Sequence, residues 1–333
     1  MATQAVTDER PATPDFPVVH ELKTHNHLIG DLAALDEAWR RDGYWFFRDV
    51  LDTDAVGKLR AEYVAELERQ GVTDPVGDAP TDRSVCYNGA SLADYPFRME
   101  PLADRQLWKL LAAQKPINDF FQRLFEDEPF WVPIAEYRAT PPSREPAQPR
   151  IDGIHQDGPY SPGLPFRICW IPLAEIDENV GGLILAEGLT EEINRHPKLA
   201  NGSNTSIPLD AIPADAWRRA TYRAGDVLLM NLWTPHTGLS NISDRFRLSL
   251  DTRIMARGDD CPIVGEVVSI ATDRVEVKDD RGVQALRIEP ATYVRNTRGQ
   301  KLSGTEITDF FTPGSDVIIA RTGDLATVVR PPH

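Results

Sequence analysis

Residues 153–160 read GIHQDGPY, which places an imidazole and a carboxylate one residue apart. Residues two apart in a β-strand project from the same face, so His155 and Asp157 converge on one point if this stretch is extended. Together they could supply two ligands to a metal ion. A lone His-x-Asp pair also arises often by chance, and by itself it is more typical of a structural position. A metal site here needs at least one further ligand.

The third ligand is predicted to be His236, which directly follows the apolar, strand-like run GDVLLMNLW. The other histidines lie near the N-terminus, in an irregular loop or at the last position. Two neutral imidazoles and one carboxylate occupy one face of an octahedron, the ligand set of non-haem Fe(II) oxygenases. Two open positions can chelate a 2-oxo acid, and the third can take O2. We therefore expect His155, Asp157 and His236 to be the metal ligands and catalytic residues.

A bound 2-oxo diacid also needs a cation for its far carboxylate. Arginine suits this role, because its planar fork matches a carboxylate. In the run NISDRFRLSLDTRI, Arg247 and Ser249 share one strand face while the apolar residues between them share the other. Arg247, helped by Ser249, is the predicted clamp. Arg245 on the same face is its rival, and a surface charge is the alternative role for Arg247.

Taken in order, these residues resemble a known family. The His-x-Asp pair, the distant His236 and an arginine eleven residues later look like the phytanoyl-CoA dioxygenase-like branch of Fe(II)/2-oxoglutarate-dependent oxygenases. HTGLSNISDRFR is similar to that family's His-x-Ser-x-x-Asn-x-Ser-x-x-x-Arg stretch. DGYWFFRDVLDTDAVGKLRAEY and WIPLAEIDENVGGLILAEGLT resemble its N-terminal helix–strand–helix and the segment between its ligands. The resemblance covers residues 30–256.

The resemblance implies a double-stranded β-helix (a cupin-like jelly roll) that binds Fe(II), with 2-oxoglutarate and O2 as cosubstrates and Arg247 on the 2-oxoglutarate. Two departures stand out: Gly238 replaces a frequent serine, and AEGLT replaces a Pro-Gly-Ser-His stretch. Related halogenases lack the carboxylate that Asp157 supplies. Asp157 therefore favours hydroxylation, or another oxygen-derived oxidation, over halogenation.

The expected substrate is a small natural product or an amino-acid-derived compound. The acidic chain shows no clear basic patch, which argues against a coenzyme A ester. Several aromatic residues near the ligands in sequence could contact the substrate or could simply pack in the core. Arg138 could bind a substrate anion or pair with a nearby carboxylate. The predicted substrate-binding residues are Arg138, Tyr160, Phe166, Trp170, Trp233 and Asn88.

Helices and a strand are predicted ahead of the site. DLAALDEAWRRDG reads as a helix with Asp31 as its N-cap and Gly43 just past its end. The aromatic run YWFFRDV predicts a strand, and residues 52–71 show apolar side chains at helical spacing. A further helix is expected over residues 102–125, with a break or kink forced by Pro116.

From about residue 130 onward, short β-rich runs separated by turn signals predict a mainly β protein with flanking helices. We expect a disordered leader over residues 1–18, an oxygenase domain over 19–257 and a small C-terminal β-barrel over 258–333. A stabilising appendage is the simplest role for the barrel, with a lid, a dimer contact or a spacer as alternatives.

Bulk composition narrows the partners. The 333-residue chain carries a formal net charge of −15, which repels phosphate backbones and anionic lipid, so nucleic acid and membrane partners are not expected. Three cysteines without a CxxC pair, and an N-terminus without the features of a secretory signal, favour a cytoplasmic protein. A homodimer stays open.

Two other classes of function compete with the oxygenase. One is a non-catalytic, metal-containing β-helix that binds a ligand or an interaction partner. The other is a zinc or manganese hydrolase on a cupin-like barrel. Arg247 discriminates against the hydrolase, because hydrolysis does not require a clamp for a 2-oxo acid.

Overall fold

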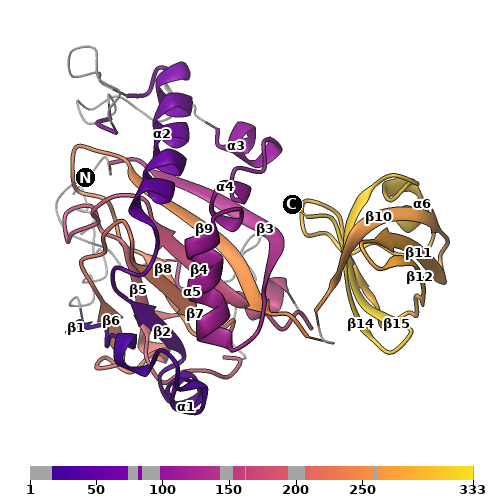
Figure 1. The fold of residues 1–333 in the computed structure, drawn as a ribbon, viewed down its shortest axis with the longest axis horizontal. Helices are drawn as coiled ribbons and strands as arrows, with labels where there is room; N and C mark the ends of the chain where they lie inside the picture. Colours follow the sequence, from indigo (N-terminus) through magenta and orange to yellow (C-terminus); the bar gives the residue numbers. More distant parts are fainter. Residues whose placement is uncertain are drawn as a thin grey trace, which may run out of the picture.

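Three β-sheets organise the described part of the chain, two of them stacked and the third closed into a separate barrel (Figure 1). The computed structural model describes residues 17–73, 82–84, 98–142, 153–161, 163–193, 207–258 and 261–332. Most of the predicted leader therefore lies outside the described residues. None of the described helices is both long and apolar enough to cross a membrane.

The larger of the stacked sheets has five strands in the order β2-β7-β4-β9-β3, all paired antiparallel. Strand β9 lies between β4 and β3, and β3 forms an edge. The strands are β2 (Tyr44–Phe47), β3 (Pro129–Thr140), β4 (Arg167–Pro172), β7 (Val227–Met230) and β9 (Arg247–Ala256).

The smaller sheet has the order β1-β6-β5-β8. Its strands are β1 (His20–Glu21), β5 (Leu183–Ala186), β6 (Trp217–Arg219) and β8 (His236–Gly238). One buried cluster joins the facing sides of both sheets: it combines Phe46, Trp170 and Leu228 of the larger sheet with Leu185 of the smaller. Two sheets packed face to face around such a core form the expected jelly roll.

Helices cover the outer face of the larger sheet (Figure 1). Alternation within β9 explains why: Leu248 and Leu250 face the helices in the main apolar core, while the residues between them face the jelly-roll interior. The helices are α1 (Leu32–Asp42), α2 (Thr53–Arg69), α3 (Glu100–Asp104), α4 (Lys109–Ala112) and α5 (Lys115–Phe125), with short 3-10 turns η1 (Asn26–Leu28), η3 (Gly158–Tyr160) and η4 (Leu209–Ala211).

The local signals for α1 and α2 are confirmed. Asp31 accepts a hydrogen bond from the Ala34 amide at 3.0 Å, and Gly43 adopts the left-handed conformation (φ 85°) that ends α1. Residues 102–125, expected as one helix with a break, fall instead into three short helices. Pro116 lies in the first turn of α5, where its missing amide costs nothing.

The C-terminal barrel has its own apolar core, which includes Val275, Val277 and Phe311. It closes because β12 pairs both with β11 and, through Arg287 and Leu325, with β15. Its elements are β10 (Ile263–Ile270), β11 (Arg274–Asp279), β12 (Gly282–Arg287), β13 (Tyr293–Val294), α6 (Thr305–Phe310), β14 (Asp316–Thr322) and β15 (Leu325–Arg330). The predicted barrel is confirmed.

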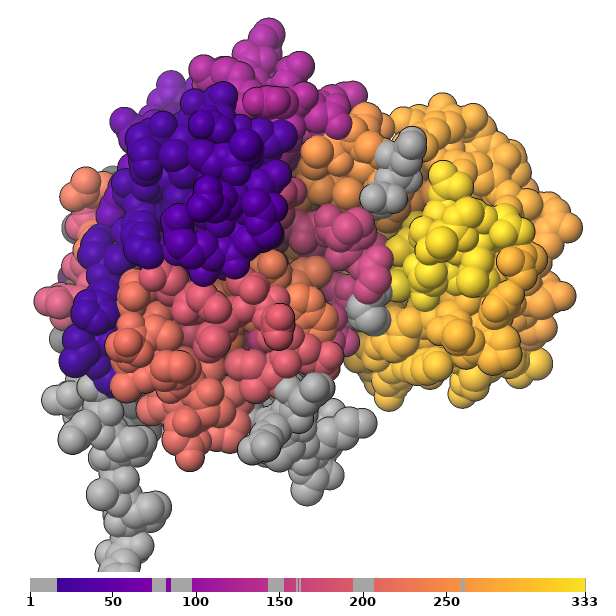
Figure 2. All heavy atoms as spheres, turned by 90° about the horizontal axis from the view of Figure 1, so that it is seen from below, coloured from indigo at the N-terminus to yellow at the C-terminus, as the bar shows by residue number. Residues whose placement is uncertain are grey.

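The barrel packs against the jelly roll, as the orange-to-yellow atoms in Figure 2 show. One apolar cluster crosses the junction and unites Ile318 and Val328 of the barrel with Val132, Phe166 and Met255 of the oxygenase region. This junction brings the barrel into contact with Phe166, one of the predicted substrate-binding residues.

Candidate active site

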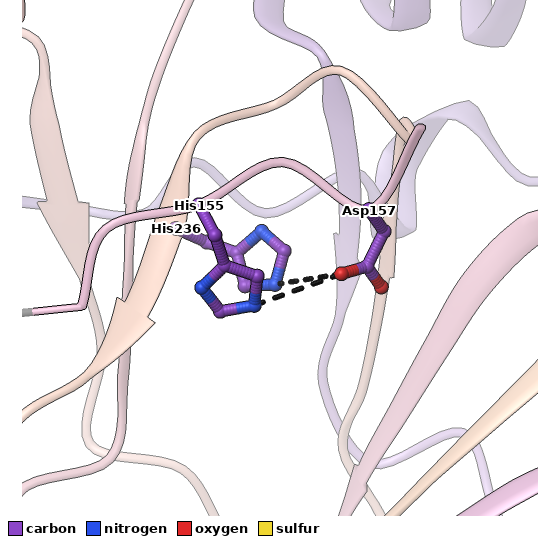
Figure 3. A group of neighbouring side chains, drawn as sticks. All are labelled: His155, Asp157 and His236. Carbon is purple, nitrogen blue, oxygen red and sulfur yellow. Dashed lines mark ion pairs between the residues drawn. The ribbon is translucent and has the colours of Figure 1, made fainter. Parts of the chain in front are cut away.

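The two histidines of the site are tied together by their backbones. His155 and His236 form an isolated antiparallel bridge, and each amide donates to the carbonyl of the other at 3.0 Å. His236 opens β8, opposite Leu185 of β5. Their rings lie 4.4 Å apart between centroids. The smaller sheet therefore positions both imidazoles on one side (Figure 3).

Asp157 reaches the histidines by a turn instead of the expected extended strand. Its backbone is helical (φ −83°, ψ −17°) and caps η3, because Gly158 and Pro159 start that 3-10 turn. Asp157 Oδ1 lies 3.6 Å from His155 Nε2 and 4.0 Å from His236 Nε2 (Figure 3). One ligand atom from each of the three residues lies within 4.8 Å of the other two.

Hydrogen bonds orient both imidazoles. His155 Nδ1 lies 2.8 Å from the Gly153 carbonyl, and His236 Nδ1 lies 3.0 Å from the Thr234 carbonyl. A carbonyl oxygen only accepts, so Nδ1 carries the proton in each neutral ring. Both Nε2 lone pairs are then directed toward Asp157, as metal ligands require.

The environment favours the protonation states that a metal needs. Burial, followed by the charge of His155, lowers the pKa of His236 to about 4, so its ring is neutral at pH 7. Burial alone would raise the pKa of Asp157, but His236, Arg253 and His155 together hold it below its usual value. Neutral imidazoles and an ionised carboxylate fit a divalent iron ion in this triad.

Arg253 is a site residue that the sequence analysis did not identify. Its Nη2 donates to Asp157 Oδ2 at 3.3 Å, on the side away from the histidines, and its Nη1 donates to Asp251. Asp251 and Arg253 continue the alternation of Arg247 and Ser249 along β9. The same alternation, followed two strand positions beyond Asp251, could have placed Arg253 on the inner face of the sheet. Arg253 holds the Asp157 carboxylate in place.

Arg247, the predicted clamp, lies against β8. Its guanidinium donates to the Leu239 carbonyl at 2.7 Å and to Thr140 Oγ1 at 3.1 Å. A side chain on Gly238 would crowd it, because a Cβ there would lie 2.5 Å from Arg247 Nη2. Burial, then the charge of Arg138, lowers the pKa of Arg247 to about 10. Among the described residues, no carboxylate forms an ion pair with it.

The other predicted residues scatter around this core. Ser249 is buried opposite Arg138 of β3. Arg138 pairs with Glu136 and lies 4.0 Å from Asp251. Trp170 packs edge-to-face on Tyr222 with ring centroids 4.7 Å apart, in the core between the sheets. Asn88 and the side chain of Tyr160 lie outside what the structure describes.

Phe166 and Trp233 line one hollow of about 490 Å³ beside the turn that carries Asp157. Trp233 packs directly on Gly158, where a Cβ would lie 2.5 Å from its ring. A cavity of about 570 Å³ lies farther away, between α4, β3 and the barrel, and none of the three triad residues lines it. The triad and that cavity are therefore separate features of the described structure.

This chain is similar to two named hydroxylases and to solved structures. It is 26% identical over 246 residues to 1-deoxypentalenic acid 11-beta-hydroxylase of Streptomyces exfoliatus, and 28% identical over 246 residues to the enzyme of that name from Streptomyces arenae. Each match covers 68% of this chain and 82% of the relative. EctD from S. alaskensis, solved with 2-oxoglutarate and 5-hydroxyectoine, overlaps 72% of this chain and 80% of its own at 18% identity, with a TM-score of 0.42.

The family comparison is decisive. The sequence model of phytanoyl-CoA dioxygenase (PhyH) matches residues 39–249, which hold the triad and Arg247. The non-catalytic alternative is set aside, because the matched family is described as a dioxygenase and both relatives are named as hydroxylases. The chain belongs to the phytanoyl-CoA dioxygenase family and is an oxidoreductase that uses Fe(II) and 2-oxoglutarate.

Proposed function

We propose that this oxygenase hydroxylates a C–H bond of a small natural product or an amino-acid-derived substrate, with release of succinate and CO2. The observation that carries the proposal is the pairing of the His155–Asp157–His236 triad with Arg247, a buried cation whose described partners are all neutral. The names of the two Streptomyces relatives, both hydroxylases of a small carboxylic acid, support the same reaction class.

His155, Asp157 and His236 would hold the iron. When bound, iron supplies the activation of O2 and the oxidative decarboxylation of 2-oxoglutarate that the side chains cannot perform. The chain keeps both Nε2 atoms unprotonated through the carbonyls of Gly153 and Thr234. Arg253 fixes the orientation of Asp157, which leaves Oδ1 directed at the histidines.

Arg247 would bind the far carboxylate of 2-oxoglutarate. Gly238 and His236 share one face of β8, two residues and therefore about 7 Å apart along the strand. The guanidinium lies against Gly238, so its charge is separated from the triad by about the length of a five-carbon diacid. Ser249 continues the same inner face of β9. A buried cation without a carboxylate partner gains most from such a ligand.

The substrate would lie along the inner face of β3, where Glu136 and Arg138 keep 49% and 52% of their side chains exposed. Positioning one C–H bond next to the triad is the protein's own contribution to selectivity. Phe166, which packs with Val132 and Ile134 of β3 and lies under the Arg253 guanidinium, is the predicted aromatic residue best placed to shape that space.

The test is to supply iron, 2-oxoglutarate and isotopically labelled O2 together with a library of natural products and amino-acid derivatives that includes 1-deoxypentalenic acid. We expect a product that gains one labelled oxygen atom and forms in equal amount with succinate, detected by mass spectrometry. A product that loses two hydrogens without gaining oxygen would replace hydroxylation with desaturation. Succinate without any oxidised product from the library would contradict the substrate class.

A further inference from the structure

Two arginines of the C-terminal barrel lie side by side at the junction with the jelly roll. Strands β13 and β15 pair in parallel, with Tyr293 opposite Val328, and the Arg295 amide donates to the Val329 carbonyl at 3.0 Å. Arg295 and Arg330 are each two residues beyond Tyr293 and Val328. By strand alternation they belong to the same face as those residues.

That face is turned toward the oxygenase region. Val328 packs with Val132 of β3 and with Phe166, and Ile318, which lies opposite Arg330 across β14 and β15, belongs to the same cluster. Phe166 also lies under the Arg253 guanidinium, at 5.8 Å from ring centroid to Cζ. The two barrel arginines therefore lie near the part of the jelly roll that contains Arg253 and its partner Asp157.

Neither arginine has a carboxylate partner among the described residues. Arg330 is 4% exposed, and its one hydrogen bond in this part of the chain runs from Nε to the Pro331 carbonyl at 3.0 Å. Arg295 Nε is buried without a hydrogen-bond acceptor. Buried cations are normally paired, because an isolated charge loses its hydration without compensation.

The carboxylates on the facing wall already have partners. Glu136 pairs with Arg138, and Asp157 and Asp251 both pair with Arg253. Taken together, the four arginines of the described junction (Arg138, Arg253, Arg295 and Arg330) exceed its three carboxylates by one positive charge, in a chain whose formal net charge is −15.

The electrostatics agree with this geometry. Burial, followed by the charges of Arg295 and Arg253, lowers the pKa of Arg330 to about 9, while Glu136 raises it. Burial also lowers the pKa of Arg295, and Glu136 opposes that shift. Arg330 therefore remains cationic at neutral pH, and Glu136 of β3 acts on the pKa of both side chains.

We propose that Arg330, with Arg295 beside it, binds the carboxylate of an organic acid substrate that lies between β3 and the barrel. The inference rests on the proposed function, whose substrate class it narrows to acids. Both arginines lie outside residues 39–249, the part of the chain that the family shares. The barrel would thus supply substrate recognition to the oxygenase centre.

The experiment measures binding and needs no turnover. The full chain is titrated with benzoic, cyclohexanecarboxylic and adamantane-1-carboxylic acids, each matched to its neutral primary amide, with inorganic phosphate as a separate arm. We expect at least one acid to bind wild-type protein about 10-fold or more tightly than its amide, as a charged hydrogen bond should provide. Arg330→Met should remove that preference, and Arg330→Lys should keep part of it.

Arg321→Met is the matched control, because Arg321 is exposed on the same barrel and donates only to the Gly323 carbonyl within the described structure. It should leave the preference unchanged. Unliganded Arg330→Met should also unfold at a higher temperature than wild type, since the variant no longer buries an unpaired charge. A structural arginine would show the opposite. If Arg330→Met does not fold, Arg330→Lys and Arg295→Gln carry the same test.

Three results would overturn the inference: acids that bind wild type no better than their amides, a preference that survives in Arg330→Met, or binding of phosphate alone. Binding of 2-oxoglutarate with Fe(II) is measured without air on the same samples. If the acids bind more tightly than their amides but 2-oxoglutarate does not bind, the proposed function is contradicted and the Arg330 site is retained. If 2-oxoglutarate binds but the acids bind no more tightly than their amides, only the Arg330 site is contradicted.

Discussion

Strand β9 carries an arginine near each end of its inner face, and the two differ in what they contact. Arg253 contacts two carboxylates, those of Asp157 and Asp251. Arg247 donates to the Leu239 carbonyl and to Thr140 Oγ1, which are neutral. An arginine that already pairs with carboxylates can hold those carboxylates in place. The positive charge of an arginine with neutral partners is instead available to an anionic ligand.

This difference in partners distinguishes two roles for arginine that the residue type alone would not distinguish. We propose that Arg253 orients the metal ligand Asp157 and that Arg247 binds the carboxylate that arrives with 2-oxoglutarate. Arg330 of the barrel resembles Arg247 in this respect, since its described hydrogen bond is to a backbone carbonyl. Substitutions at Arg247 and at Arg253 should therefore have different consequences for the binding of 2-oxoglutarate and of iron.

The largest effect is expected at the Arg247 end. Arg247→Ala should raise the KM for 2-oxoglutarate by about 10²–10³-fold, because truncating one member of a buried charge pair costs about 2–5 kcal/mol. Iron affinity in the absence of 2-oxoglutarate should hardly change. Succinate production against 2-oxoglutarate concentration measures this, with Arg245→Ala as the control. A larger effect in the control would transfer the clamp to Arg245.

Arg253→Met should act on iron instead. Loss of a residue that orients a metal ligand typically costs about 10- to 100-fold in metal affinity. Competition with a chelator for Fe(II) measures that loss, and 2-oxoglutarate affinity at saturating iron should stay near the wild-type value. Arg257→Met, which removes an arginine paired with Glu128, is the control. Equal iron affinities in both variants would remove the scaffold role of Arg253.

Asp251 sharpens the comparison through pH. Burial raises its pKa to about 6, against an ordinary value of 3.8, so the folded protein binds the extra proton between these values. Stability contributed by this group is therefore present at low pH and lost as pH rises from about 4 to 6. Asp251→Asn should lack that loss, which amounts to at most about 3 kcal/mol. Urea unfolding across this range checks the slope, and parallel curves for both proteins would contradict the assignment.

The smallest effect is expected from Gly238→Ala. Its new Cβ would lie 2.5 Å from Arg247 Nη2, and the guanidinium must shift to make room. A displaced clamp should raise the KM for 2-oxoglutarate about 5- to 10-fold, which corresponds to a modest overpacking penalty. Gly258→Ala is the matched control, because a Cβ there meets nothing within 4 Å. An unchanged KM in Gly238→Ala would show that the clamp adapts freely.

Local signals in the sequence were sufficient for much of the fold. The cap at Asp31 and the apolar spacing of α2 act within a few residues, and both appear where expected. The His-x-Asp pair and His236 could be grouped because their ligand chemistry leaves few alternatives. Their convergence in the structure depends on the backbone bridge between His155 and His236.

Other features depend on contacts that no local pattern encodes. Asp157 meets the histidines through a 3-10 turn, because Gly158 and Pro159 do not continue a strand. Arg253 was missed as a site residue, since only the folded sheet shows that it reaches Asp157. The orientation of Arg330 toward the jelly roll depends on how the core of the barrel packs against the jelly roll. Alternation within β15 indicates a face but not its neighbour.

The central claim is that one ferrous ion is held by side chains from two distant parts of the chain. Anaerobic titration of the protein with Fe(II) at saturating 2-oxoglutarate, followed by visible absorption, tests it most directly. We predict a weak charge-transfer band that saturates at one iron per chain and is absent from His236→Ala. A band of full strength in His236→Ala, or no band in wild type, would contradict the assignment.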